Sequence, residues 1–161
     1  MKKMKYIFLM FLLPFIGFSQ NPNFKIEDKT IIWQWVYNDS LDLANIKQNL
    51  KLEFLTDTTG KLKRTNFNDK NLREQIAEFK IEEKQGRYRV TVFNIKIIPM
   101  QVSFDLGGIS SMPDDLVSFE DIMIKNNGTM KAKLMGFDIT EALNKHYLDL
   151  FTIKKRTNED W

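Results

Sequence analysis

The sequence predicts an α+β domain in which two helices lie on one face of an antiparallel sheet. Three observations predict it: residues 31–37 alternate as a strand does, two further alternating segments surround the turn Gln85-Gly86, and two stretches repeat apolar residues at helical spacing. Each of these elements has one apolar face. Packing both helices on one side of the sheet buries all of these faces together.

Residues 31–37 are rich in β-branched and aromatic side chains and are expected to form the first strand. One face of this strand carries Ile31, Trp33, Trp35 and Tyr37, and the other carries Ile32, Gln34 and Val36. Asn38-Asp39-Ser40 then ends the strand and offers a helix N-cap. The helical spacing of Leu43, Ile46 and Leu50 predicts a helix over residues 40–53.

The middle of the chain predicts a hairpin. Residues 76–83 alternate apolar and polar side chains, Gln85-Gly86 is a turn, and residues 87–98 are compatible with a strand throughout. The polar residues 56–73 ahead of this hairpin carry no readable pattern. The hairpin is therefore the firmest pairing that the sequence provides.

Shorter elements are expected after Pro99. Residues 102–106 alternate as a strand, and residues 112–115 are loop-like. Two more strands, 119–125 and 129–135, are expected on either side of the turn at residues 126–128, where Asn and Gly tolerate positive φ.

A second helix ends the predicted domain. Asp138 and Glu141 have the spacing of a capping box, and the residues that follow form an apolar stripe: Leu143, Tyr147, Leu150 and Phe151. The order of elements is then strand, helix, several antiparallel strands, helix.

The N-terminus predicts export from the cell. Three lysines precede an apolar run from Tyr6 to Phe18, and Gly17 and Ser19 suit cleavage after residue 19. An uncleaved anchor is the alternative, but a helix of this run would span roughly 20 Å of a hydrocarbon core of about 30 Å. We therefore expect a signal peptide at 1–19, a leader at 20–30, a single α+β domain at 31–156 and a polar tail at 157–161, located in the periplasm or outside the cell.

Charge and cysteine content exclude several partners. The chain has 24 basic and 21 acidic residues, but Lys2, Lys3 and Lys5 belong to the signal peptide, so the remainder is formally neutral and no nucleic-acid partner is expected. There is no cysteine, which excludes disulfides, thiolate chemistry and a lipid anchor on cysteine. After signal cleavage no apolar run is long enough to span a membrane.

Three segments resemble a known family. They are residues 17–20 (GFSQ), residues 86–96 (GRYRVTVFNIK) and residues 158–161 (NEDW). In these the chain resembles the small exported proteins of Bacteroidota grouped as "domain of unknown function 4468". The resemblance implies a fold like that of the TATA-binding protein, with the order β-α-β(4)-α. It assigns no catalytic residue, and the name of the fold does not imply DNA binding.

The inventory of catalytic residues is poor, and no catalytic residue, metal ligand or cofactor site is predicted. His146 is the only histidine, and Ser110 or Ser111 lies in no nucleophile-elbow motif. Acidic residues gather loosely between Phe104 and Ile122 without the spacing of a calcium loop: Asp105, Asp114, Asp115, Glu120 and Asp121. These are interpreted as solvated charges. The cations Arg87, Arg89 and Lys96 are interpreted as a solvated sheet face or edge, with anion binding as the alternative.

One feature suggests a binding site. Trp33, Trp35 and Tyr37 share a strand face and are the candidate ligand-binding residues, as a stacking platform for a glycan or another planar ligand. The favoured alternative is that this face packs beneath the helices, because Ile31 lies on it and Gln34 lies opposite. The open face would then carry Ile32, Gln34 and Val36.

Two function classes remain. The first is a non-catalytic exported module that binds an envelope protein or glycan through its open sheet face. The second is a small envelope hydrolase that uses surface carboxylates. The first is favoured because no pair of titratable residues has a recognisable catalytic spacing.

Overall fold

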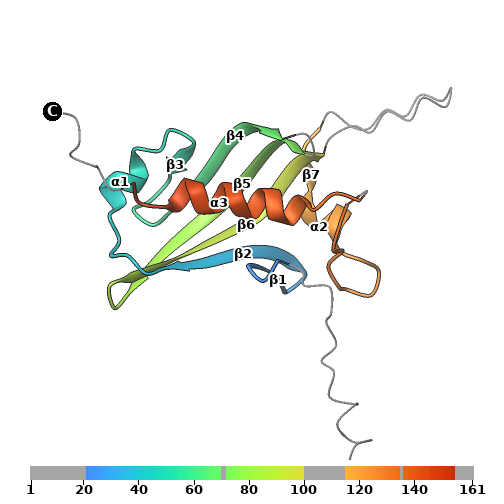
Figure 1. Cartoon of the computed structure of the whole chain (residues 1–161), viewed down its shortest axis with the longest axis horizontal. Helices are drawn as coiled ribbons and strands as arrows, with labels where there is room; N and C mark the ends of the chain where they lie inside the picture. The colour runs from blue at the N-terminus through green and yellow to red at the C-terminus, as the bar shows by residue number, and fades with distance from the viewer. Residues whose placement is uncertain (1–20, 70–71, 100–114, 135, 155–161) are drawn as a thin grey trace, which may run out of the picture.

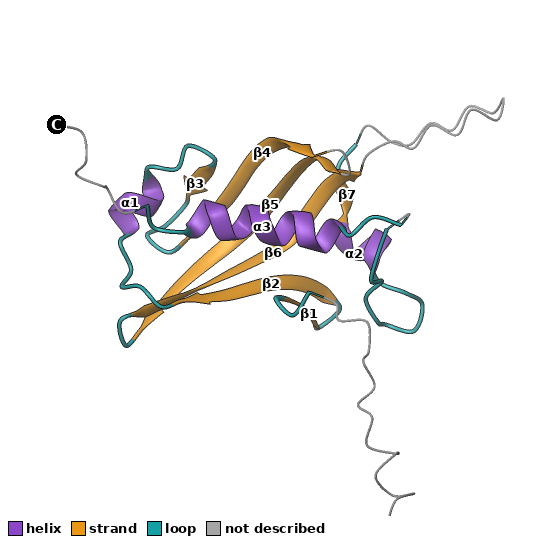
Figure 2. Ribbon diagram, viewed as in Figure 1, coloured by secondary structure: helices purple, strands orange, loops and turns teal. Residues whose placement is uncertain are grey.

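The computed structural model describes residues 21–69, 72–99, 115–134 and 136–154. It has the expected α+β class: the strands form one antiparallel sheet, and the helix α3 (Ile139–Phe151) lies across one face of that sheet (Figures 1 and 2). The predicted signal peptide at 1–19, the strand at 102–106, most of the loop at 112–115 and the tail at 157–161 lie outside the described residues.

The described part of the chain contributes seven strands to the sheet. They are β1 (Phe24–Glu27), β2 (Thr30–Tyr37), β3 (Leu52–Phe54), β4 (Thr59–Asp69), β5 (Leu72–Lys84), β6 (Arg87–Pro99) and β7 (Val117–Ser118). Their order across the sheet is β1-β2-β6-β5-β4-β3, and β7 pairs with β6. The expected hairpin is confirmed as β5 and β6, joined at Gln85 and Gly86, which both have positive φ.

The described residues contain three helices where two were expected: α1 (Leu43–Lys47), α2 (Phe119–Met123) and α3. The second expected helix is confirmed as α3, whose N-cap Asp138 accepts a 3.0 Å hydrogen bond from the Glu141 N–H. The first is much shorter than residues 40–53, because Leu50 of the predicted stripe is exposed and the chain enters β3 at Leu52.

The strand expected at 119–125 is wrong, because this segment forms α2. Phe119 and Met123, one helical turn apart, are both buried, and Glu120 and Asp121 place negative charge at the positive end of the helix. The turn at 126–128 is present, but it closes only an isolated bridge between Ile124 and Met130.

The segment 20–30, expected to be a leader ahead of the domain, contributes β1 to the sheet. Asp28 and Lys29, at φ 47° and 66°, form the two-residue turn of a hairpin with β2. Phe24 of β1 is buried in the core. The expected domain boundary at residue 31 therefore excludes a strand that belongs to the sheet.

The unreadable stretch at 56–73 contains most of β4, which pairs with β5 along its length. Of the β4 side chains described, Leu62 is the only buried large apolar one, so the strand offers no alternation to read. A strand of this kind is stabilised mainly by pairing with its neighbouring strands, and its own sequence gives little sign of it.

The core lies between the sheet and α3. Its strand members include Trp33, Phe79 and Val92, and its helix members include Leu143 and Tyr147. The buried apolar residues of α1 and α2 join this same cluster, so all three described helices pack toward one side of the sheet. No described helix is long and apolar enough to cross a membrane.

Candidate functional site

The three candidate aromatic residues are not equally accessible. Trp33 is 0% exposed and Tyr37 is 7% exposed, whereas Trp35 is 39% exposed. The Trp33 Nε1–H donates a 2.9 Å hydrogen bond to Asn144 Oδ1 of α3, and its ring meets that of Tyr147 edge-on with centroids 5.3 Å apart. Trp33 is therefore a core residue fixed by α3.

Tyr37 is held in the same way. Its ring stacks on Tyr88 with centroids 4.6 Å apart, and its hydroxyl donates to the Leu148 carbonyl at 3.2 Å. Burial raises the pKa of the Tyr37 hydroxyl far above its usual range, and burial also raises the pKa of Tyr88 to about 12. Both hydroxyls therefore stay protonated as donors. The interpretation that this strand face packs beneath a helix is confirmed for Trp33 and Tyr37, and a ligand can reach only Trp35.

The opposite side of the sheet, which we call the open sheet face, carries mostly polar side chains in cross-strand rows. The register places Val36 beside Arg89 and Arg89 beside Glu82. Two further rows follow the same pairing: Gln34, Thr91, Lys80 and Thr59, then Phe93, Glu78, Lys61 and Glu53. None of the described helices places its buried residues on this face.

Two of the register shifts in the sheet lie at the same level of β5. The β4–β5 register shifts between Leu62 and Thr65, and the β5–β6 register shifts between Ile76 and Glu78. In β6 this shift includes Asn94, whose φ of 51° is unusual for a residue other than glycine. Bulges increase local twist and are common beside functional sites. Here they flank the same short stretch of β5 from both sides.

A groove of about 740 Å³ opens at these bulges. This groove is lined by Thr30, Glu53, Lys61, Leu62, Lys63, Arg64, Ile76, Ala77, Glu78, Asn94, Ile95, Lys96, Ser118 and Glu120. Its size lies within the range of about 300–1,000 Å³ that is typical of small-molecule sites. We take this groove as the candidate functional site.

Several charges of the groove are already engaged. Arg64 forms an ion pair with Glu74. Glu120 accepts hydrogen bonds from the Ile31 N–H at 2.9 Å and from the Ser118 hydroxyl. The carboxylate of Glu120 therefore holds the start of β2 against α2 and is poorly placed to serve as a catalytic base.

The three lysines of the groove differ in how far neighbouring carboxylates offset their charge. Lys61 has Glu53 and Glu78 as its direct cross-strand neighbours, which offset its charge. Lys63 and Lys96 are exposed and form no ion pair with any residue that the structure describes. Together with the hydroxyls and the Asn94 amide, they suit a polar or anionic ligand.

Of the described residues that the sequence analysis considered for catalysis or metal binding, Glu120 alone lines the groove. No group of three or more His, Asp or Glu residues within them can hold a metal ion. His146 lies on α3, and burial lowers its pKa to about 4, helped by Lys51 and opposed by Asp149. Of the loose acidic cluster, Asp115 and Asp121 are exposed, while Asp105 and Asp114 lie outside the described residues, as do Ser110 and Ser111.

The predicted cations are divided between two places. Lys96 lines the groove, whereas Arg87 and Arg89 lie toward the β5–β6 turn. The Arg89 guanidinium donates two hydrogen bonds to Glu82 Oε2, from Nη2 at 2.7 Å and from Nε at 3.2 Å. These bonds lower the pKa of Glu82, and the hydrogen bond from Lys80 is the next largest cause. Sequence reasoning missed Lys61 and Lys63, because the bulges that bring them to the groove leave no periodic signal. The one available signal is Asn94 within a run of strand-forming residues.

A scan against protein-family models, a search of curated proteins and a search of solved structures each found no match to the chain. The resemblance carried by residues 86–96 and the two shorter segments therefore stays a prediction. The candidate site is defined by its own geometry.

Proposed function

We propose that the chain is an exported, non-catalytic binding module of the bacterial cell envelope and that the groove on its open sheet face holds the ligand. The observation that carries the proposal is the groove itself, which joins paired bulges, exposed lysines and hydroxyls over an apolar floor. The signal-peptide pattern at 1–19 supports export, into the periplasm or beyond it.

We further propose kinship with the "domain of unknown function 4468" proteins and a fold like that of the TATA-binding protein. The support is the order of elements. When β1, β7 and α2 are set aside, β2, α1, the four strands β3 to β6 and α3 follow the order β-α-β(4)-α. The three additional elements are short and lie beside β2 or β6.

The ligand class favoured by the groove is an oligosaccharide with carboxylate or phosphate groups. Lys63 and Lys96 suit an anionic substituent, and Thr30, Ser118 and Asn94 suit sugar hydroxyls. The alternative partner for the open sheet face is an envelope protein.

Calorimetry with matched oligosaccharides tests the proposal. A carboxylated oligosaccharide should bind more tightly than its neutral analogue, and Lys96→Glu should weaken binding at least about tenfold, which is about 1.4 kcal/mol. Lys145→Glu, an exposed change on α3, is the matched control and should leave binding unchanged.

The hydrolase alternative is tested by analysing the same protein and oligosaccharide samples for cleavage products. Its best candidates are Glu53 and Glu78, which line the groove. Cleavage of the oligosaccharide that is lost in Glu78→Gln would replace the binding-module proposal with an enzyme. Equal binding by the native protein and the Lys96→Glu variant would move the ligand site away from the groove.

A further inference from the structure

The outer edge of β2 is only half covered. β1 pairs with β2 from Thr30 to Trp33, and the last bond on this side runs from the Gln34 N–H to the Asn23 carbonyl at 2.8 Å. β2 continues to Tyr37 while pairing with β6 on its inner side. Within the described residues, no strand pairs with the outer side of Trp35–Tyr37. Figure 1 shows β1 beside one end of β2 only.

The backbone at this uncovered edge points outward at Val36. Along a strand, the N–H and C=O groups of alternate residues point to the same side. The Gln34 N–H points toward β1, so the N–H and C=O groups of Val36 also point away from β6. A peptide lying along β2 would find a donor and an acceptor there.

The side chains around Val36 are apolar and exposed. Trp35 is 39% exposed on the α3 side of the sheet, and Val36 is 44% exposed on the open sheet face. Among the residues whose burial the structure describes, the other exposed large apolar ones lie outside strands: Leu50, Leu55 and Phe137. A strand added along this edge would therefore partly bury one apolar side chain of β2 on each face of the sheet, Trp35 on one and Val36 on the other.

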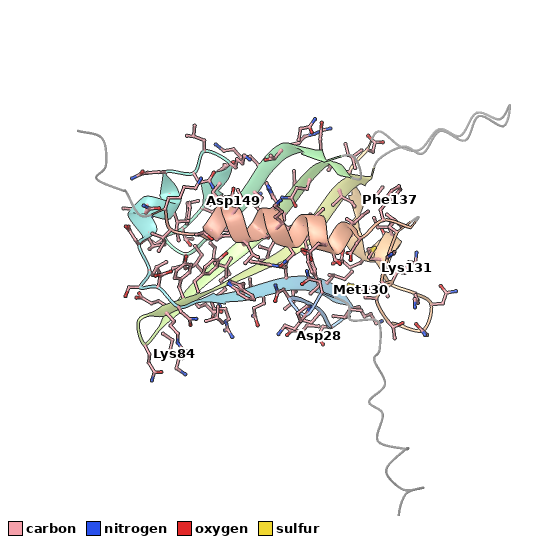
Figure 3. All side chains as sticks on the ribbon, viewed as in Figure 1. Asp28, Lys84, Met130, Lys131, Phe137 and Asp149 are labelled. Carbon is pink, nitrogen blue, oxygen red and sulfur yellow. The ribbon has the colours of Figure 1, made fainter. Side chains whose placement is uncertain are left out.

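The open sheet face beside this edge is positively charged. A hollow of about 370 Å³ next to Val36 is lined by Glu82, Glu83, Lys84, Arg87, Tyr88 and Arg89. Arg89 and Lys80 share the single carboxylate of Glu82, and Lys84 and Arg87 form no ion pair among the described residues. Glu83 also lines the hollow, so the three cations of the hollow exceed its two carboxylates by one. Lys84 lies at the tip of the β5–β6 hairpin (Figure 3).

We propose that the edge of β2 at residues 35–37 binds an extended peptide segment of a partner protein by strand addition. The partner segment alternates acidic residues, which face Arg87 and Arg89 on the open sheet face, with aromatic or aliphatic residues, which pack on Trp35. Charge complementarity selects this partner over a second copy of the chain, because β2 itself presents Gln34 and Val36 on that face and no acid. This surface is separate from the groove.

Hydrogen exchange on the native chain tests the proposal without any substitution. The probe is a capped seven-residue peptide of alternating Phe and Glu, and its matched control has Lys in place of Glu. The Val36 amide should exchange quickly in the free protein and at least about tenfold more slowly with the Glu peptide. Unchanged Val36 exchange with saturating Glu peptide would overturn the proposal. Without peptide, protection of the Val36 amide that grows with protein concentration would also overturn the proposal, because it would indicate that a second copy of the chain occupies the edge.

Substitutions at three positions separate the backbone contact, the charge contact and the groove. Val36→Pro removes the outward N–H, while Val36→Ala keeps it, so only the Pro variant should lose peptide binding by about tenfold or more. Arg87→Glu should weaken the Glu peptide and strengthen the Lys peptide. Lys96→Glu in the groove should leave peptide binding unchanged, which separates this surface from the proposed ligand site. Equal binding by Val36→Pro and Val36→Ala, or by the Glu and Lys peptides, would contradict strand addition by an acidic segment.

Discussion

Trp33 and Trp35 lie two residues apart on the same face of β2, yet only one is buried. Trp33 lies under Asn144 and Tyr147 of α3, which provide a hydrogen-bond acceptor and an aromatic edge. Trp35 lies on the same strand face but stays 39% exposed. The position of one helix therefore decides which tryptophan stabilises the fold and which is free for a partner.

Substitution of the two tryptophans measures this difference. Trp33→Ala should lower the free energy of unfolding by about 3–5 kcal/mol, because it leaves a large cavity and removes the buried hydrogen bond from the indole N–H to Asn144 Oδ1. Trp35→Ala, the matched control, should cost less than about 1 kcal/mol. Urea unfolding gives both values.

Iodide quenching provides a second readout, best made in a Trp161→Phe background. Trp33 should be protected from iodide and Trp35 should be quenched. Equal losses of stability for the two alanine variants, or equal quenching of the two rings, would contradict the placement of α3.

Among the secondary-structure elements, the sequence predicts best those whose apolar pattern and whose turn or cap residues indicate the same structure. The β5–β6 hairpin has long strands and a turn, Gln85-Gly86, that accepts positive φ, so its position follows from the sequence. The cap of α3 at Asp138 and its buried stripe follow in the same way. In each case local chemistry and tertiary packing favour the same structure.

Elements that depend on their neighbours could not be predicted. β4 has Leu62 as its one buried large apolar side chain among those described, and β1 depends on Phe24 reaching the core. The groove depends on two register shifts at one level of the sheet, which no periodicity in either strand encodes. Of the residues singled out from the sequence, Lys96 and Glu120 line the groove, and they were interpreted there as a strand cation and a solvated acid.

Helix α3 carries a half-buried histidine that makes stability depend on pH. His146 has a pKa of about 4 in the folded chain, below its usual 6.5, mainly because burial disfavours the charged form. Between these two values the unfolded chain binds a proton that the folded chain does not. The free energy of unfolding should therefore fall as the pH falls from about 6.5 to about 4, by at most about 3 kcal/mol.

The His146→Gln variant isolates this contribution, because it cannot take up the proton in either state. Urea unfolding at pH 7, 5.5 and 4 should show a smaller loss of stability in the variant than in the native chain. Carboxylates that also titrate in this range contribute equally to both proteins. Parallel pH profiles for the two proteins would show that His146 is not the group responsible.

At the scale of the whole molecule, the first described residues tie the layers together. The Asn21 side-chain amide donates to Glu141 Oε2 at 2.9 Å, and that of Asn23 donates to Asn144 Oδ1 at 2.7 Å. Phe24 packs between the rings of Phe119 and Tyr147, with centroid distances of 6.1 and 6.4 Å. The segment expected to be a leader thus contacts α2, α3 and β2 at once.

Removal of this segment tests whether the domain begins near residue 21 or near residue 31. A chain that begins at Thr30 lacks Phe24 and the hydrogen bond from Asn23, so it should be less stable than a chain beginning at Gln20 by about 4 kcal/mol or more. Phe24→Ala in the longer chain is the matched control and should account for about 3–5 kcal/mol of the loss. Calorimetric unfolding of the three proteins measures these differences. If the shortened chain unfolded within about 0.5 kcal/mol of the longer one, β1 would be peripheral and the domain would begin at β2, because a change that small is typical of surface positions.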